Sequence, residues 1–189
     1  MPTIIAPNLV GMALDFTKLK LRQRDGVTCG PSAAIVAAAM LDPDYAARLE
    51  QAGWFQAEQA TLHRQLNAVW PRALGTTPFG MVEALNSHRD RSGLRYHWRF
   101  ARFTRLDEIR DAVVRERPVP MLLGKVIPRH WVLLIGHQSG RFRIYDPGVG
   151  DVLLATAAEL RGGLGFPQVF GYVVPEPVVP EPVVPDPAP

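Results

Sequence analysis

Cys29 is the only cysteine in the chain and carries the clearest signal of chemistry. It stands in the segment TCGPSAAIVAAAM, where a run of alanines predicts a helix and Pro31 fits the first turn. Cys29 is therefore expected at a helix N-terminus, where the helix dipole lowers the pKa of a thiol and favours the nucleophilic thiolate. Most lone cysteines are small buried apolar residues, so the surroundings must decide between these two interpretations.

A nucleophilic thiol needs a base, and His130 is the strongest candidate among five histidines. It opens the apolar segment WVLLIG, which predicts a central strand whose rigid end holds the imidazole. His137 ends the same strand seven residues later, where regular alternation predicts the opposite face. The remaining histidines, His63, His88 and His97, occur in contexts typical of surface or packing residues.

Asp146 is the expected partner of His130. It ends the segment RFRIYDP, and a hairpin through QSG would bring the end of this strand beside the start of the preceding one. An acceptor there fixes the tautomer and orientation of the imidazole, although Asp-Pro-Gly is also a favoured turn sequence. Gln23, six residues before Cys29, and the backbone N-H of Cys29 could donate to a developing oxyanion.

Together these segments resemble the papain-like bacteriocin-processing peptidase family and its stand-alone relatives, over about residues 18–174. The resemblance implies that Gln23 lines the oxyanion hole, Cys29 attacks the scissile carbonyl, His130 shuttles the proton and Asp146 orients it. Gly30 and Trp131, next to these residues, are expected to contact the substrate. Leader-processing members are usually fused to an ABC transporter, whereas no membrane part is predicted in this sequence, and the segment 42–92 matches nothing in the family.

The elements that must position these residues predict an α+β fold: a papain-like domain with a helical N-terminal half packed on a C-terminal antiparallel sheet. Helices are expected before Pro43, over 57–70 and 79–88, and from an N-cap at Thr104 up to Pro118. Strands are expected over 94–103, 119–127, 130–137 and 141–147. A short helix capped by Thr156 and a last strand over 166–174 complete the domain.

Length and composition predict one domain, residues 1–174, with a single core, because 47% of the 189 residues are hydrophobic. Residues 175–189 repeat VVPEP, VVPEP and VVPDP, which predicts a disordered polyproline II tail that joins no sheet. It would serve as a stiff linker or as a docking peptide for a partner that binds proline-rich segments.

Several partners and cofactors are not expected. Charged residues of both signs are spread along the chain and the formal net charge is only +3, which argues against nucleic-acid binding. No signal peptide or membrane span is predicted, so a cytoplasmic protein is expected unless a specialised secretion system exports it. No cofactor is expected, because metal-ligand spacings are lacking and GGLG at 162–165 has no lysine of a phosphate loop.

Three functions fit the sequence. The first is a cysteine peptidase that cleaves a peptide or protein amide bond through a Cys/His/Asp triad and a thioester acyl-enzyme. The second is a glutamine deamidase or transglutaminase-like effector or toxin with the same triad. The third is a catalytically inactive papain-like module that binds a partner and uses the tail as a tether.

Overall fold

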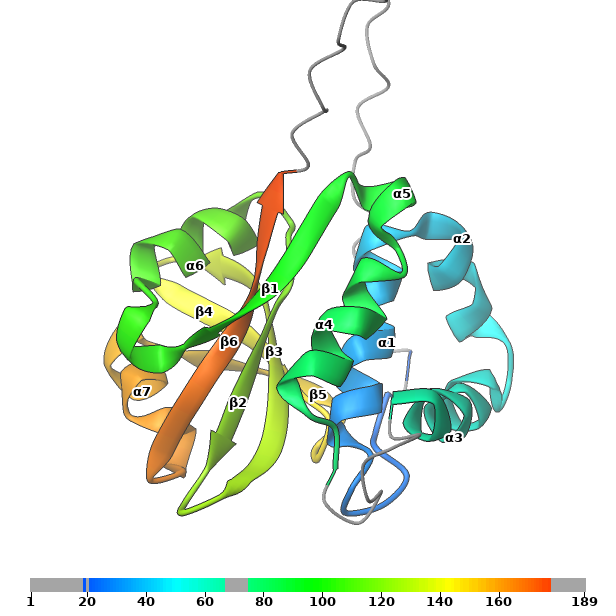
Figure 1. Ribbon diagram of the computed structural model, residues 1–189, viewed down its shortest axis with the longest axis horizontal. Coiled ribbons are helices and arrows are strands. Elements are labelled where there is room, and N and C mark those ends of the chain that lie inside the picture. The colour runs from blue at the N-terminus through cyan, green and yellow to red at the C-terminus, as the bar shows by residue number, and fades with distance from the viewer. Residues whose placement is uncertain (1–18, 20, 67–74, 178–189) are drawn as a thin grey trace, which may run out of the picture.

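The computed structural model describes residues 19, 21–66 and 75–177. A six-stranded antiparallel sheet forms the middle layer (Figure 1), with the strand order β1-β6-β2-β3-β4-β5. The strands are β1 Leu94–Phe100, β2 Val119–Gly124, β3 Pro128–Gln138, β4 Arg141–Asp146, β5 Asp151–Ala155 and β6 Gln168–Pro177. Mixed helices and an antiparallel sheet confirm the α+β class.

Helices cover both faces of the sheet (Figure 1). One face carries α1 Cys29–Leu41, α2 Pro43–Ala46, the 3-10 turn η1 Ala47–Glu50, α3 Trp54–Leu66, α4 Pro78–Asn86 and α5 Arg89–Ser92. The other carries α6 Leu106–Val114 and α7 Ala157–Arg161, with 3-10 turns η3 Ala101–Phe103 and η4 Gly163–Gly165. The helices before β1 therefore pack on one side of the sheet, as expected, and two later helices close the other side. Every helix in the described ranges lacks the length or the apolar character needed to cross a membrane.

Two apolar cores, one on each face, hold the layers together. On β3, Trp131, Leu133 and Ile135 belong to the core under α1, whereas Val132 and Leu134 belong to the core under α6. This alternation is the period of two that a strand buried on both faces requires. Helix α1 is buried at every position from 29 to 39, so its alanines allow close approach to the sheet and to α3 and α4.

The structure confirms the predicted strands, with small shifts at their ends, and corrects one cap. Thr156 forms a capping box with Glu159 at the start of α7. Thr104 is not an N-cap: α6 begins at Leu106, and the hydroxyl of Thr104 donates instead to the carbonyl of Phe100 at 3.1 Å.

The prediction that the proline-rich tail joins no sheet is wrong for its first three residues. Strand β6 runs to Pro177, and its end pairs with β1 through Arg95 and Glu176 among others. Pairing between β6 and β2 stops at Tyr172, so the prolines face an unpaired side of the strand, where a missing N-H is tolerated. The rest of the predicted tail, residues 178–189, lies outside the described residues.

Regular alternation after Trp131, Leu133 and Ile135 would place His137 on the face that carries α1, but β3 is irregular. The register between β3 and β4 shifts between Leu134 and Gly136. Beyond this bulge His137 pairs with Phe142, which belongs to the core under α6, and the two rings touch edge-on at 4.9 Å. An extra residue in a strand reverses the alternation after it, so His137 lies on the face that carries α6.

Candidate active site

Cys29 begins helix α1, as the sequence predicts. The preceding residue, Thr28, is buried and does not cap the helix; its hydroxyl accepts instead from the backbone N-H groups of Arg24 and Asp25, at 3.1 and 3.2 Å. These bonds fold the loop before α1 back onto the helix end. The thiol therefore lies where first-turn N-H groups have no intrahelical acceptor and the dipole favours negative charge.

His130 and Asp146 meet across the start of β3 and the end of β4. Nε2 of His130 lies 2.8 Å from Oδ1 of Asp146, and the two side chains are 14% and 18% exposed. The same carboxylate oxygen accepts the backbone N-H of Gly148 at 2.8 Å. Since Nε2 bonds the carboxylate, Nδ1 is the ring nitrogen left for Cys29, whose side chain also interacts with the imidazole.

Electrostatics favour the charged forms of His130 and Asp146. Burial lowers the pKa of His130, but hydrogen bonds with Asp146 and Cys29 and their negative charges outweigh burial and raise the pKa to about 9. Burial also works to raise the pKa of Asp146, whereas the His130 bond and the N-H groups of Gly148 and Val149 hold it below its usual value. At neutral pH the arrangement is an imidazolium between a carboxylate and a sulfur atom.

Gln23 joins this group from the loop before α1. Its backbone N-H donates to the carbonyl of Pro147 at 2.8 Å, and its side-chain nitrogen donates to the carbonyl of Asp25 at 2.6 Å. Oε1 of Gln23 is buried and has no hydrogen-bond partner among the described residues. A methyl group placed on Gly148 would lie within 4.0 Å of Gln23, His130 and Asp146 alike, so the turn after β4 is where these side chains converge.

Three contacts that the sequence does not reveal hold the Gln23 loop. Gln59 of α3 is fully buried, accepts the N-H of Arg24 at 2.9 Å and donates to the carbonyl of Arg22 at 3.3 Å. The hydroxyl of Tyr145 donates to the carbonyl of Leu21. Arg22 donates through Nε to the carbonyl of Gly148 at 3.0 Å. The segment 42–92, for which the resemblance offers no counterpart, thus supplies a support for the site.

The turn after β4 also fits tightly against this loop. Gly150 has a φ of +78°, and a Cβ there would approach the Cβ of Arg22 to 2.8 Å, so a larger residue would be strained and would collide. The turn that carries Asp146 and the loop that carries Gln23 therefore form one closely packed unit.

Gly30 and Trp131, the two residues expected to contact substrate, pack against each other and against Thr76. A Cβ on Gly30 would collide with the side chain of Thr76 and lie 3.2 Å from the Trp131 ring. Trp131 is only 2% exposed, and its indole N-H donates to the carbonyl of Thr76 at 2.9 Å. Both residues hold the segment before α4 against the start of α1, and a substrate contact stays a prediction.

Phe166 adds an aromatic wall that sequence reasoning missed. Its ring stacks on the His130 imidazole, with centroids 5.4 Å apart and an interplanar angle of 18°. Phe166 follows η4, where Leu164 takes a left-handed conformation with φ 55°. The only signal in the sequence is the glycine-rich GGLG just before an aromatic residue, which predicts a tight turn but not its position.

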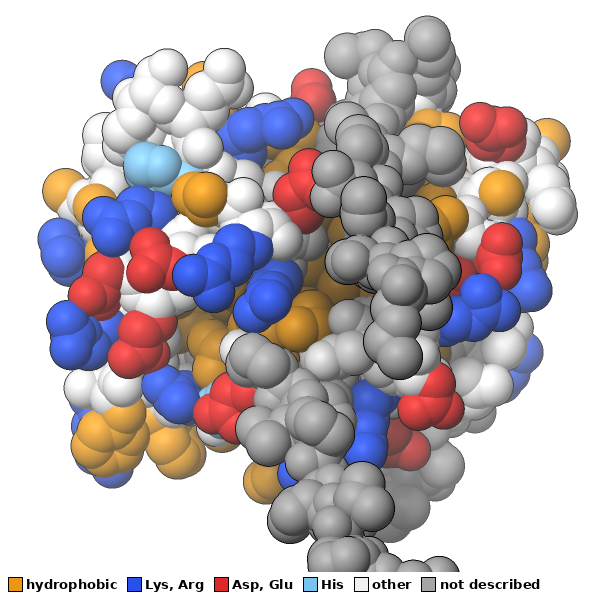
Figure 2. Space-filling model, turned by 90° about the horizontal axis from the view of Figure 1, so that it is seen from above, with side chains coloured by type: hydrophobic (Ala, Val, Ile, Leu, Met, Phe, Trp, Pro, Cys, Tyr) orange, Lys and Arg blue, Asp and Glu red, His pale blue; other side chains and the backbone are white. Residues whose placement is uncertain are grey.

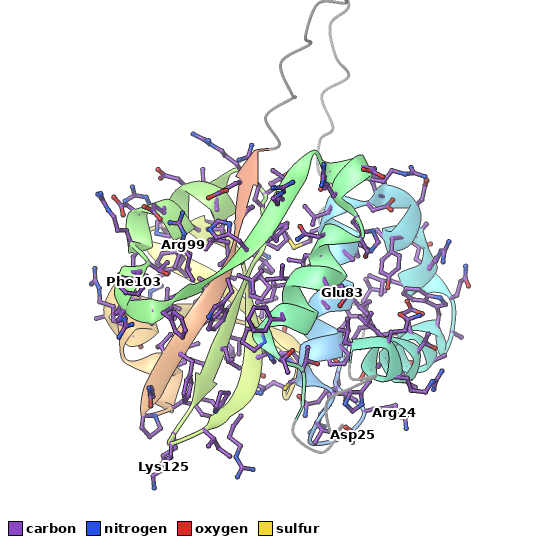
Figure 3. All side chains as sticks on the ribbon, viewed as in Figure 1. Arg24, Asp25, Glu83, Arg99, Phe103 and Lys125 are labelled. Carbon is purple, nitrogen blue, oxygen red and sulfur yellow. The ribbon has the colours of Figure 1, made fainter. Side chains whose placement is uncertain are left out.

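The elements that bring these residues together meet at one end of the molecule. Figure 3 shows Arg24 and Asp25, in the loop before α1, at the same end as Lys125, in the turn between β2 and β3. The other histidines lie elsewhere: His88 faces Asp42 at 3.4 Å, and His97 faces Glu176 at 3.4 Å. Among the described residues, no three His, Cys, Asp or Glu side chains gather in a way that could hold a metal ion.

Comparisons with known proteins give a distant likeness to peptidases. Neither protein-family models nor curated proteins gave a match. Among solved structures, the chain is similar to a double-glycine motif protease from an AMS/PCAT transporter in complex with the leader peptide, at 16% identity and a TM-score of 0.46, over 82% of this chain and 89% of that chain. It is also similar to the peptidase domain of Streptococcus ComA, a bifunctional ABC transporter in a quorum-sensing pathway, at 18% identity and a TM-score of 0.47, over 82% and 96% of the two chains. Both belong to the kind of peptidase that the sequence motif resembles.

Proposed function

We propose that the chain is a papain-like cysteine peptidase that cleaves an amide bond of a peptide or protein through an acyl-enzyme on Cys29. The single observation that carries this proposal is the placement of His130, which bonds Asp146 at 2.8 Å through one ring nitrogen and interacts with the cysteine through the other side of the ring. A thiol, an imidazole and a carboxylate in this order match the requirement for nucleophilic catalysis by cysteine.

The first half of the reaction forms the thioester. The Cys29 thiolate attacks the carbonyl carbon of the scissile amide, and the electron pair of the C=O bond moves onto the oxygen. The His130 imidazolium then donates its proton to the leaving amine as the C-N bond breaks. Acting as an acid suits a histidine whose pKa is raised to about 9, because the proton is already in place at neutral pH.

The second half returns the enzyme to its starting state. His130, now neutral, removes a proton from water, and the resulting hydroxide attacks the thioester carbonyl and releases the acid and the thiolate. Asp146 keeps the ring in one orientation and stabilises its positive charge in both halves.

Donors for the oxyanion come from the start of α1 and from Gln23. A first-turn N-H such as that of Cys29 has no acceptor within the helix and can donate to the substrate oxygen. The side-chain nitrogen of Gln23 already donates to the carbonyl of Asp25, so its second N-H is the one available for the oxyanion.

Mass spectrometry with a peptide library tests the proposal. Incubation with the wild-type chain should create new peptide ends, and Cys29→Ala should create none while its circular dichroism spectrum stays unchanged. Cys29→Ser is the matched control for size, and it should also be inactive because a serine hydroxyl is not ionised by this neighbourhood. Cleavage by Cys29→Ala would contradict the proposal, and a gain of about one dalton on glutamine without cleavage would identify a deamidase instead, since an acid replaces an amide.

Iodoacetamide labelling separates an enzyme from an inactive binding module. A thiolate stabilised by His130 should be alkylated at pH 6 much faster than a free cysteine, of which less than about 1% is ionised at that pH. Labelling as slow as that of a free cysteine would exclude an activated nucleophile.

A further inference from the structure

A cavity lies on the opposite face of the sheet from α1. It has a volume of about 610 Å³ and opens between η3, α6 and α7, over β4 and β6. Its size lies within the range of small-molecule sites. None of the catalytic residues proposed above lines it. In Figure 3 the labelled Arg99 and Phe103 mark the side of the molecule that carries α6, away from Glu83 on α4.

The cavity has an apolar floor. Phe142 of β4 is 3% exposed, and Val169 and Tyr172 of β6 continue the same surface. His137 lies at one wall with its ring against Phe142. An apolar body bound here would be stabilised by about 25 cal/mol for each Å² of apolar surface removed from water.

The rim is positively charged. Three arginines line it, Arg105, Arg110 and Arg161, against one carboxylate, Asp107. Figure 2 shows Lys and Arg side chains interspersed with acidic ones on this side of the molecule. Arg105 donates to both carboxylate oxygens of Asp107, at 3.2 and 2.7 Å, and Arg110 donates to the carboxylate of Asp111 at 3.3 Å.

Arg161 is the arginine whose charge is not balanced. It forms no ion pair with any other residue that the structure describes, and its positive charge acts on the phenol of Tyr172. The Tyr172 hydroxyl has no hydrogen-bond partner in the described ranges, and burial raises its pKa to about 12, which keeps it a neutral donor. A guanidinium and a phenol thus line the same apolar cavity, and an oxyanion can accept hydrogen bonds from both.

We propose that this cavity binds an organic oxyanion, namely a carboxylate or phosphate monoester attached to an apolar body. The anionic group bonds Arg161 and Tyr172, and the apolar body lies on Phe142 and Val169. A neutral apolar molecule would leave the guanidinium without an acceptor, and a cation would be repelled by it. Binding does not require the catalytic residues, so it is expected in Cys29→Ala as well.

Displacement of a fluorescent sulfonate tests the site. The probe is 8-anilinonaphthalene-1-sulfonate, an anion with an apolar body, titrated into the full chain until its fluorescence saturates. Octanoate and octyl phosphate should displace it at concentrations well below those needed for octan-1-ol, which has the same chain and no charge. Displacement by only one of the two anions also supports the proposal and identifies the source of the oxyanion as an acid or a phosphate ester.

Substitutions test whether Arg161 is responsible for anion binding in the cavity. Arg161→Gln should weaken binding of both the probe and the anions by about ten-fold or more, because a charge-assisted hydrogen bond is lost, and Tyr172→Phe should weaken it by a smaller factor. Arg64→Gln removes the same charge from α3 on the other face and should change nothing. Equal displacement by octan-1-ol, an unaffected Arg161→Gln variant, or no saturable binding would each overturn the proposal.

Discussion

Replacing Asp146 by asparagine removes one negative charge from the site and leaves its geometry in place. The oxygen that faces His130 also accepts the backbone N-H of Gly148, so the side-chain oxygen of the asparagine would keep both bonds. A hydrogen bond to a charged group contributes about 1.5–3 kcal/mol and a neutral one about 1 kcal/mol. The loss of charge therefore costs the imidazolium about 1–2 kcal/mol, which lowers the pKa of His130 by about one pH unit.

The pKa of His130 is measurable by NMR. Carbon-13 label in the histidine rings, titrated from pH 5 to pH 10, gives five resonances, and His130→Gln identifies the relevant one. The wild-type value should be near 9, as burial opposed by Asp146 and Cys29 implies. Asp146→Asn should lower it and should slow the alkylation of Cys29 at pH 6 about ten-fold, because the thiolate depends on the neighbouring positive charge.

Asp151→Asn is the matched control. Asp151 stands opposite Asp146 in the ladder between β4 and β5 and is exposed, and among the described residues it bonds only the N-H of Val152. The same loss of charge there should leave the pKa of His130 and the alkylation rate unchanged. If Asp146→Asn left both quantities at the wild-type values, the carboxylate would be a turn residue without influence on the imidazole.

Three other changes test the surroundings of the site. In urea unfolding, the free energy of unfolding of the wild type should fall by up to about 3 kcal/mol relative to that of His130→Gln between pH 6.5 and pH 9. A histidine whose folded-state pKa is raised stabilises the folded chain below its unfolded-state pKa, and this contribution disappears as the pH rises through the folded-state pKa. Gln59→Leu should lower the free energy of unfolding by about 2 kcal/mol and slow turnover, since two backbone groups of the Gln23 loop lose their partner; unchanged turnover would show that the loop holds itself. Gly30→Ala should lower the free energy of unfolding by about 1–3 kcal/mol in the same urea assay, because a methyl group collides with Thr76. An unchanged free energy would mean that the segment carrying Thr76 moves freely.

The arrangement of Cys29, His130 and Asp146 was predictable because each of its parts follows from local rules. Proline and alanines after Cys29 predict a helix that starts there, and alternation in two strands joined by a short turn predicts the hairpin that brings His130 beside Asp146. These relations depend on neighbours in sequence or on a single turn. The fold class follows in the same way from helices that precede a series of strands.

The supports of the site were not predictable, because they come from packing between distant segments. Gln59 lies 35 residues from Arg24, whose N-H it accepts, and Trp131 lies 55 residues from Thr76, to which it donates. A glutamine within a polar helix and a tryptophan at the start of an apolar strand have many equally good positions. Only the assembled layers decide which backbone groups they meet.

Strand β3 runs from the candidate active site to the cavity beneath α6, and the bulge within it explains why the sequence does not predict that cavity. Regular alternation after Trp131, Leu133 and Ile135 would place His137 on the face that carries α1. The register shift between Leu134 and Gly136 turns the end of the strand, so His137 reaches Phe142 and the cavity beneath α6. A one-residue irregularity leaves no signature in the alternation of apolar residues, yet it reverses every side chain beyond it. His130 at the start of β3 and the cavity at its end are thus separated by a bulge. Variants of Arg161 are therefore expected to alter anion binding while the bond between His130 and Asp146 stays in place.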